Sequence, residues 1–165
     1  MEIEIVQARP EHASIVPHLR AADIEEIRAS TGLPPCAAVA YSIAASKAWC
    51  VLLDGAPIVL WGLGPPEMGN PAKHPGSGPK ALVWLVGTEE IERYPVMFYR
   101  VSKRLFPQVC AWHEELANWV DARNILSLRW LAWLGFDIGK PEPHGVLGLP
   151  FHFVKFRKEK PACAQ

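Results

Sequence analysis

Two groups of acidic and polar side chains have the types and the spacing for proton-transfer chemistry. Asp23 and Glu26 lie three residues apart in LRAADIEEI, so a helix places both on one face, and Arg20 lies three residues before Asp23. These side chains form a local ion network, or else Asp23, Glu25 or Glu26 lines a substrate groove. The second group is Thr88 and Glu89, directly after an apolar run. Glu89 is a candidate general base toward an amine, and the alternative is a helix cap with an acidic first turn.

Composition and spacing argue against several other functions. The formal net charge is zero, which disfavours general nucleic-acid binding. The six histidines lack the spacing of a metal clip, so we predict no structural metal. The four cysteines lack paired C-x-x-C spacing, which favours a reduced, cytoplasmic setting. The N-terminus does not have the pattern of a secretory signal, and no apolar run approaches the roughly 20 residues of a membrane span.

The elements that must position these side chains are organised around LANWVDARNILSLRWLAWLGF, residues 116–136. Its first five residues predict a short buried strand. Asn124 can cap the first turn of a helix, and the stretch 125–134 contains neither Pro nor Gly. Gly135 can take the left-handed conformation that ends a helix. Because leucines form the inward stripe of this helix, Trp130 and Trp133 are candidates for a surface that faces solvent or a partner.

The rest of the chain alternates between strand and helix patterns. We expect an α+β fold, with a central mixed sheet of about six strands flanked by helices, in a single domain over 1–158 with a flexible tail over 159–165. The predicted strands are 3–6, 49–53, 57–63, 81–86, 116–120, 136–138 and an edge strand 151–156; the predicted helices are 11–20, 21–30, 36–47, 97–106 and 125–134; and the predicted Gly- and Pro-rich loops are 64–79 and 139–150. Asp54-Gly55 predicts a tight hairpin turn, and Pro107 is expected to end or kink its helix.

The run from Asn124 to Gly135-Phe136 resembles the last conserved block of the GNAT superfamily of acyl-CoA N-acyltransferases, N-x-x-A-h-x-h-Y-x-x-h-G-F, with the same spacing. The resemblance implies a GNAT-like fold. If the chain binds acetyl-CoA, it further implies that backbone atoms of Leu85 and Val86 hold pantetheine. Gly87, Thr88 and Asn124 then lie nearby, Glu89 is the base, and Asp23 and Glu26 line the substrate groove. Such binding needs a splayed gap between the strands that end at Val86 and begin near Leu116.

The chain departs from the GNAT pattern at two places. When Arg93 is aligned with the arginine of the R/Q-x-x-G-x-G/A coenzyme motif, the glycine positions fall on Val96 and Phe98, whose side chains would obstruct close approach of a diphosphate to the backbone. The tyrosine that commonly protonates the leaving thiolate falls on Leu131, which cannot donate a proton.

The patterns LRAADIEEI, WLVGTEE and NWVDARNILSLRWLAWLGF together resemble a narrower group, the GNAT-like phage family that includes internal virion protein A of short-tailed bacteriophages. This resemblance implies a binding role in the virion or its assembly, with other phage proteins as partners, an unused acyl-CoA motif and no firmly expected cofactor. The protein would then be in the host cytoplasm or the virion. The alternative is an active acetyl-CoA-dependent N-acetyltransferase acting on a small amine or a protein amino group. The sequence leaves enzymatic activity and homo-oligomerisation open.

Overall fold

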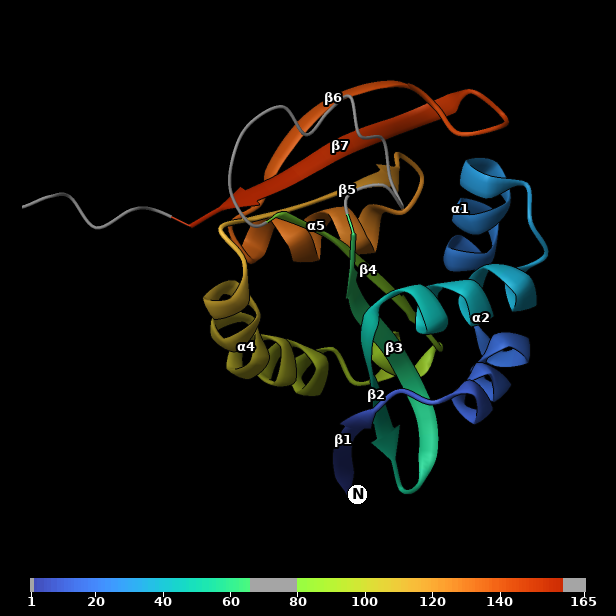
Figure 1. Ribbon diagram of the computed structural model, residues 1–165, viewed down its shortest axis with the longest axis vertical. Helices are drawn as coiled ribbons and strands as arrows, with labels where there is room; N and C mark the ends of the chain where they lie inside the picture. The colour runs from blue at the N-terminus through green and yellow to red at the C-terminus, as the bar shows by residue number, and fades with distance from the viewer. Residues whose placement is uncertain (1, 66–79, 159–165) are drawn as a thin grey trace, which may run out of the picture.

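Seven strands form one mixed sheet in the computed structural model, which describes residues 2–65 and 80–158 (Figure 1). The strands lie in the order β1-β2-β3-β4-β5-β7-β6, and only the β4–β5 pair is parallel. The tail predicted over 159–165 and most of the loop predicted over 64–79 lie outside the described residues. The strands are β1 (Ile3–Gln7), β2 (Lys47–Leu53), β3 (Ala56–Gly64), β4 (Lys80–Gly87), β5 (Glu115–Asp121), β6 (Asp137–His144) and β7 (Leu149–Arg157).

Helices cover both faces of the sheet (Figure 1). The 3₁₀ helix η1 (Pro10–His18), α1 (Ala21–Thr31) and α2 (Pro35–Ala45) lie on one face. The helices α4 (Pro95–Trp112) and α5 (Ile125–Trp133) lie on the other face, and the short α3 (Glu90–Arg93) joins β4 to α4. Within the described ranges, no helix is both long enough and apolar enough to cross a membrane.

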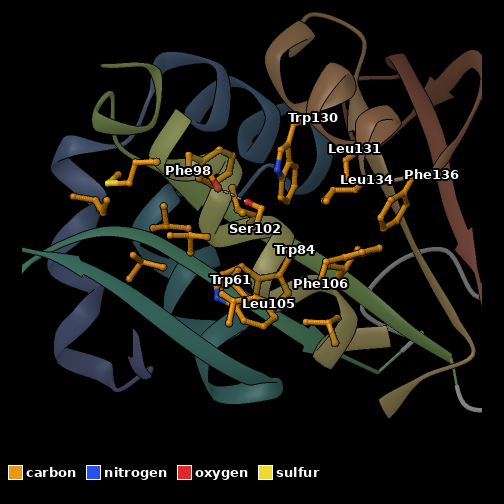
Figure 2. Close-up of a pocket in the computed structure, with 18 residues that line it drawn as sticks. Trp61, Trp84, Phe98, Ser102, Leu105, Phe106, Trp130, Leu131, Leu134 and Phe136 are labelled. Atoms are coloured by element: carbon orange, nitrogen blue, oxygen red, sulfur yellow. Dashed lines mark hydrogen bonds between the residues drawn. The ribbon is translucent and has the colours of Figure 1, made fainter. Parts of the chain in front are cut away.

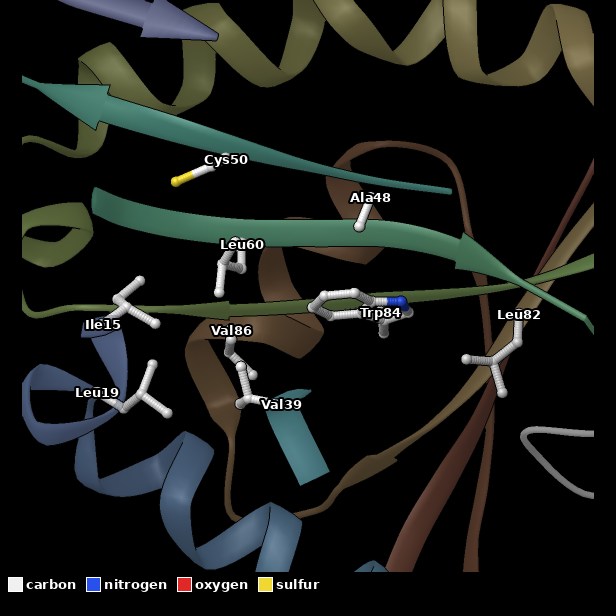
Figure 3. Close-up of a cluster of buried hydrophobic side chains, with 9 residues drawn as sticks. All are labelled: Ile15, Leu19, Val39, Ala48, Cys50, Leu60, Leu82, Trp84 and Val86. Atoms are coloured by element: carbon white, nitrogen blue, oxygen red, sulfur yellow. The ribbon is translucent and has the colours of Figure 1, made fainter. Parts of the chain in front are cut away.

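Helices cover both faces of the central strand β4, in which Leu82, Trp84 and Val86 are buried and Val83 and Leu85 are half-buried. Leu82, Trp84 and Val86 pack with side chains from η1 and α2, whereas Val83 and Leu85 face the α4 side. Figure 3 shows the cluster that contains Leu82, Trp84 and Val86, with the side chains of the strands on one side and those of the helices on the other. Burying each large aliphatic side chain contributes roughly 1.5–3 kcal/mol, so these two layers fix β4 in the sheet.

The hairpin predicted at Asp54-Gly55 is confirmed. Asp54 has φ 48° and Gly55 has φ 79°, the two positive angles of the tight turns that match strand twist. β2 and β3 pair through this turn from Leu53 opposite Ala56 to Lys47 opposite Leu63.

The C-terminal part of the sheet differs from the sequence prediction. The strand expected over 136–138 is longer than predicted, because β6 continues through residues 139–144, which were expected to be loop. The expected edge strand 151–156 belongs to β7, which lies between β5 and β6, so its assignment to an edge was wrong. Pro141 and Pro143 lack amide donors, and a sheet tolerates such residues in an edge strand, which is where β6 lies.

The longest helix, α4, continues through Pro107 to Trp112, so of the two alternatives expected for Pro107 it does not end the helix. Proline removes one helical hydrogen bond, that to the carbonyl of Lys103. Both residues are exposed, so water can satisfy the freed carbonyl, while Val109 and Cys110 in the next turn are buried against the sheet.

Candidate active site

The carboxyl halves of β4 and β5 diverge from one another. The two strands pair at only three positions, from Lys80 opposite Glu115 to Leu82 opposite Ala117. The remainder of β4, residues 83–87, has no partner on β5. The splayed gap that the acyltransferase alternative requires is therefore present.

The side chain of Asn118 lies where the strands part. Its Nδ2 donates a hydrogen bond of 2.8 Å to the carbonyl oxygen of Val83, which shows that this carbonyl faces β5. Successive residues of a strand direct their amide and carbonyl groups to alternate sides. The backbone of Leu85 therefore faces the gap, whereas that of Val86 faces β3.

Four polar side chains bridge the open end of the gap, and we call them the carboxylate cluster: Arg20, Asp23, Glu26 and Asn124. The Arg20 guanidinium donates two hydrogen bonds, of 2.7 and 3.0 Å, to Asp23. Asp23 Oδ2 accepts the Gly87 amide at the end of β4 at 2.9 Å, and Glu26 Oε2 accepts the Asp121 amide at the end of β5 at 3.1 Å. Asn124 Nδ2 donates to Glu26 at 3.0 Å and to Asp23 at 3.4 Å. The cluster thus joins the ends of both splayed strands.

Local sequence explains how these side chains meet. The helical spacing of α1 directs Asp23 and Glu26 to one side, and Asn124 is held at the start of α5, where its Oδ1 accepts the Ser127 amide at 3.4 Å. The structure therefore contains both arrangements considered for the acidic residues of α1, the ion network and the groove lining. The Arg20–Asp23 ion pair is almost completely buried, and Glu26 lines a groove.

Glu26 has an unusual protonation equilibrium. Burial of its carboxylate is the main cause that raises its pKa, and the nearby Asp23 and Asp121 add to the effect; the pKa rises to about 8 although Asn124 and the Asp121 amide donate hydrogen bonds to it. Both donors reach Oε2, which leaves Oε1 as the oxygen that can carry the proton. A carboxylate with a pKa near the working pH is suited to general base catalysis.

The groove beside Glu26 has a volume of about 380 Å³. It lies between α1, α2, the splayed strands and the end of β6, and its lining includes Tyr41, Asn118, Trp119 and His144. The β6–β7 turn closes one end, because the amides of residues 146 and 147 donate to the carbonyl groups of Ser30 and Ala29 in α1. A cavity of this size can hold a small organic molecule.

A second cavity, wholly apolar in character, lies on the opposite face of the sheet between α4 and α5 (Figure 2). Trp84 and Leu85 line both this cavity and the groove, so both border the same part of β4. Figure 2 shows Trp130 reaching from α5 into the cavity, with Phe98 on the facing helix. The ring centroids of Trp130 and Phe98 are 5.2 Å apart, and Trp130 Nε1 is buried without a hydrogen-bond partner in the described residues.

The prediction that Trp130 faces solvent or a partner is therefore wrong, because the apolar face of α5 is wider than its leucine stripe. Trp133 is exposed, as predicted, and contacts the ring of Tyr99 on α4.

The connection from β4 to α4 contains the other predicted residues. Thr88 is buried, and its Oγ1 accepts the Glu90 amide at 3.3 Å, while Glu89 is exposed at the start of α3. This is the arrangement of a helix cap. Val96 lies in the first turn of α4 with 62% of its surface exposed, whereas Phe98 packs inward. The first turn of α4 has no side-chain cap. Pro95 has no amide hydrogen and the Phe98 amide donates to the Tyr94 carbonyl, so the amides of Val96 and Met97 are the ones not occupied by a capping group.

The structure brings some of the predicted site residues together, whereas the backbone amides of others are hydrogen-bonded within the fold. Asp23, Glu26 and Asn124 meet in the carboxylate cluster, and the backbone of Leu85 faces the gap. The Gly87 amide is bonded to Asp23, and the Thr88 amide is bonded to the Ile58 carbonyl. Among the described residues, no group of three His, Cys, Asp or Glu side chains could hold a metal ion.

Four site residues were missed by the sequence interpretation: Asn118, Trp119, Tyr41 and His144. Asn118 carried a usable signal, since a polar residue within a buried apolar strand usually has a specific hydrogen-bonding role. No sequence signal marked Tyr41 or His144, because only the tertiary structure brings α2 and β6 to the groove.

Comparison with known proteins identifies the fold. Neither the protein-family models nor the curated protein sequences give a match to this chain. Solved structures do match, among them an acetyltransferase of the GNAT family from Streptococcus pneumoniae (13% identity, TM-score 0.62, 96% of this chain and 100% of that chain). A Salmonella typhimurium protein solved with its cofactor acetyl-CoA has 12% identity and a TM-score of 0.63, with 100% and 99% coverage. The ribosomal-protein-S18-alanine N-acetyltransferase of Escherichia coli has 10% identity and a TM-score of 0.62, with 99% coverage of both chains. The chain thus has the α+β GNAT fold.

Proposed function

We propose that this chain transfers an acyl group from acyl-CoA to a primary amine, with Glu26 as the general base. The observation that carries the proposal is the position of Glu26. Its carboxylate lies at the open end of the β4–β5 gap, lines the groove, and has a pKa of about 8. The GNAT fold of the acetyltransferases described above supports the same reaction class.

The residues around the gap fit the pantetheine arm of acyl-CoA. The arm carries amide groups, which need both donors and acceptors. The backbone of Leu85 offers one of each toward the gap, and the buried Trp130 Nε1 offers a further donor in the adjoining cavity. The short helix α3 occupies the position of the glycine-rich loop. We therefore assign the contact with the diphosphate of acyl-CoA to the first-turn amides of α4.

Bound acyl-CoA would supply a thioester, whose carbonyl carbon forms the new C–N bond as the C–S bond breaks and the thiolate leaves. Glu26, as a carboxylate, takes one proton from the bound ammonium group, which gives the nitrogen the lone pair it needs for attack, and passes that proton to water. The nitrogen loses its second proton to the departing thiolate. The products are an amide and a free thiol. No side-chain acid is needed at Leu131.

Kinetics of two matched variants test this assignment. With acetyl-CoA and a panel of primary amines, release of free thiol should be measurable for the native chain. Its kcat/KM should rise with pH and level off above about 8. Glu26→Gln should lower kcat/KM by about 100-fold or more, the usual contribution of a general base. Glu25→Gln is the control, because Glu25 lies on the same helix but its side chain is 54% exposed and pairs with Arg28 and Arg123.

Two results would reject the proposal. One is the absence of detectable acetyl-CoA binding by calorimetry, and the other is equal kcat/KM for Glu26→Gln and Glu25→Gln. Glu89, the candidate base named from the sequence, is the alternative residue to compare with Glu26. If Glu89→Gln rather than Glu26→Gln abolishes the pH dependence, the base is Glu89.

The virion-associated role remains a prediction from the sequence resemblance. The three solved structures named above do not support it, since two are acetyltransferases by name and the third was solved with acetyl-CoA. Sedimentation of phage particles with the tagged chain would test it: co-purification with the particles would favour the virion role.

A further inference from the structure

The groove beside Glu26 has a distinctive distribution of charge. Its described lining contains one carboxylate, that of Glu26, and no lysine or arginine. His144 is the remaining basic side chain. Burial is the main cause that lowers its pKa below the usual range, and Glu142 opposes only part of this effect. At neutral pH the described lining therefore offers no cation to a carboxylate or phosphate.

One wall of the groove, which packs against α1 through Trp119 and Ala29, is aromatic. The Trp119 indole and the His144 ring are stacked, with centroids 4.2 Å apart and an angle of 9° between their planes. Tyr41 lies at the rim on α2 with 59% of its surface exposed, and Ile27, Leu33 and Val39 add apolar surface. Flat aromatic surfaces of this kind favour rings and aliphatic groups over hydrated polar ones.

We infer that the acceptor is a small primary amine on an aromatic or aliphatic tail that carries no carboxylate, of the class represented by 2-phenylethylamine. The inference rests on the proposed function and specifies its substrate. The amine lies against Glu26 at the gap, and the tail lies between the aromatic wall and the apolar side chains of α1 and α2. The volume of about 380 Å³ accommodates one ring and a short linker.

The same features disfavour other amines. An amino acid would place its carboxylate against a described lining that has no lysine or arginine and already contains Glu26, so the carboxylate would be desolvated without a partner among those residues. A polyamine would place its additional ammonium groups against an apolar wall with one acid to share. Both should therefore bind poorly in the reacting position.

The substrate panel is 2-phenylethylamine, phenylalanine and spermidine, each with acetyl-CoA and the full chain. Phenylalanine differs from 2-phenylethylamine by the carboxylate alone. We expect kcat/KM for 2-phenylethylamine to exceed that of each of the other two by at least about tenfold. Equal or greater kcat/KM for phenylalanine or spermidine would overturn the inference while leaving the proposed acyl transfer intact.

Binding without acetyl-CoA separates the two proposals. If 2-phenylethylamine binds the chain in calorimetry but no amine is acetylated, the class of ligand inferred for the groove stands and the proposed acyl transfer fails. If 2-phenylethylamine neither binds nor reacts, the inference is wrong, whatever the other amines do.

A variant that adds a positive charge to the lining tests whether the substrate binds in this groove. His144→Arg places a cation among the lining side chains and should raise the kcat/KM of phenylalanine relative to 2-phenylethylamine by about tenfold. His18→Arg is the matched control, because His18 is exposed at the end of η1 and does not line the groove. Tyr41→Ala, a change at an exposed side chain, should weaken 2-phenylethylamine binding by a few-fold. An unchanged substrate ratio in folded His144→Arg would contradict the assignment.

Discussion

Replacing Glu26 with glutamine should change how the stability of this chain depends on pH. Glutamine keeps an oxygen that can accept the hydrogen bonds from Asp121 and Asn124, but it cannot ionise. In the native chain, Glu26 has a pKa of about 8 instead of its usual 4.5. Below pH 4.5 the group is protonated in both folded and unfolded states. Between pH 4.5 and 8 the folded chain retains a proton that the unfolded chain releases, so stability falls as the pH rises.

The size of this effect follows from the pKa difference. One pKa unit corresponds to 1.36 kcal/mol, so the rise from 4.5 to about 8 corresponds to a maximum of about 5 kcal/mol. Glu26 is half-buried and reaches the groove, where water screens its charge. We therefore expect about 2 to 3 kcal/mol of the native free energy of unfolding to be lost through Glu26 between pH 5.5 and 8.5.

Urea unfolding at these two pH values measures the effect. The quantity to compare is the free energy of unfolding of Glu26→Gln minus that of the native chain, because groups that titrate in both proteins cancel. This difference should increase in favour of Glu26→Gln by about 2 to 3 kcal/mol from pH 5.5 to 8.5. Glu25→Gln should give no such trend. If Glu26→Gln and the native chain change in parallel, Glu26 titrates normally and our assignment of the base loses its support.

Three further substitutions address the supports of the site. Asn124→Ala removes a helix cap and a donor to two carboxylates, and urea unfolding should show a loss of about 2–4 kcal/mol; a loss below 1 kcal/mol would contradict this double role. Arg20→Met leaves the buried Asp23 without its ion-pair partner and should cost about 3–5 kcal/mol by the same assay, against little change if the pair is dispensable. Gly145→Ala should lower the thermal midpoint more than Gly148→Ala, because both glycines have positive φ but only at Gly145 would a Cβ meet the backbone of α1; equal midpoints would show that the β6–β7 turn does not rest on α1.

Much of the fold could be predicted from local patterns. The central strand was visible as a continuous apolar run, and the β2–β3 turn was visible as Asp-Gly, because only a few residue types accept its backbone angles. The prolines of β6 concealed most of the length of this strand for a physical reason. Proline breaks most strands, and only the position at the sheet edge, which the sequence does not reveal, makes it acceptable.

The candidate site was predictable in part. Helical spacing alone indicated that Asp23 and Glu26 share a face, and the capping pattern identified Asn124. The sequence favoured Glu89 as the base because it follows the central strand. The structure shows it as an exposed residue at a helix start, whereas Glu26 acquires its raised pKa from burial beside Asp23 and Asp121.

The sequence by itself determined the α+β class, the turn between β2 and β3, and the residue types available for proton transfer, because each depends on neighbours within a few positions. Only the tertiary structure decided where β4 and β5 part, which carboxylate lies at that opening, and which aromatic side chains face it. These features depend on contacts between residues about one hundred positions apart, such as Asn124 with Asp23 and Glu26. Burial and charge proximity arise only when the chain has folded, and they are what distinguish one glutamate from the others.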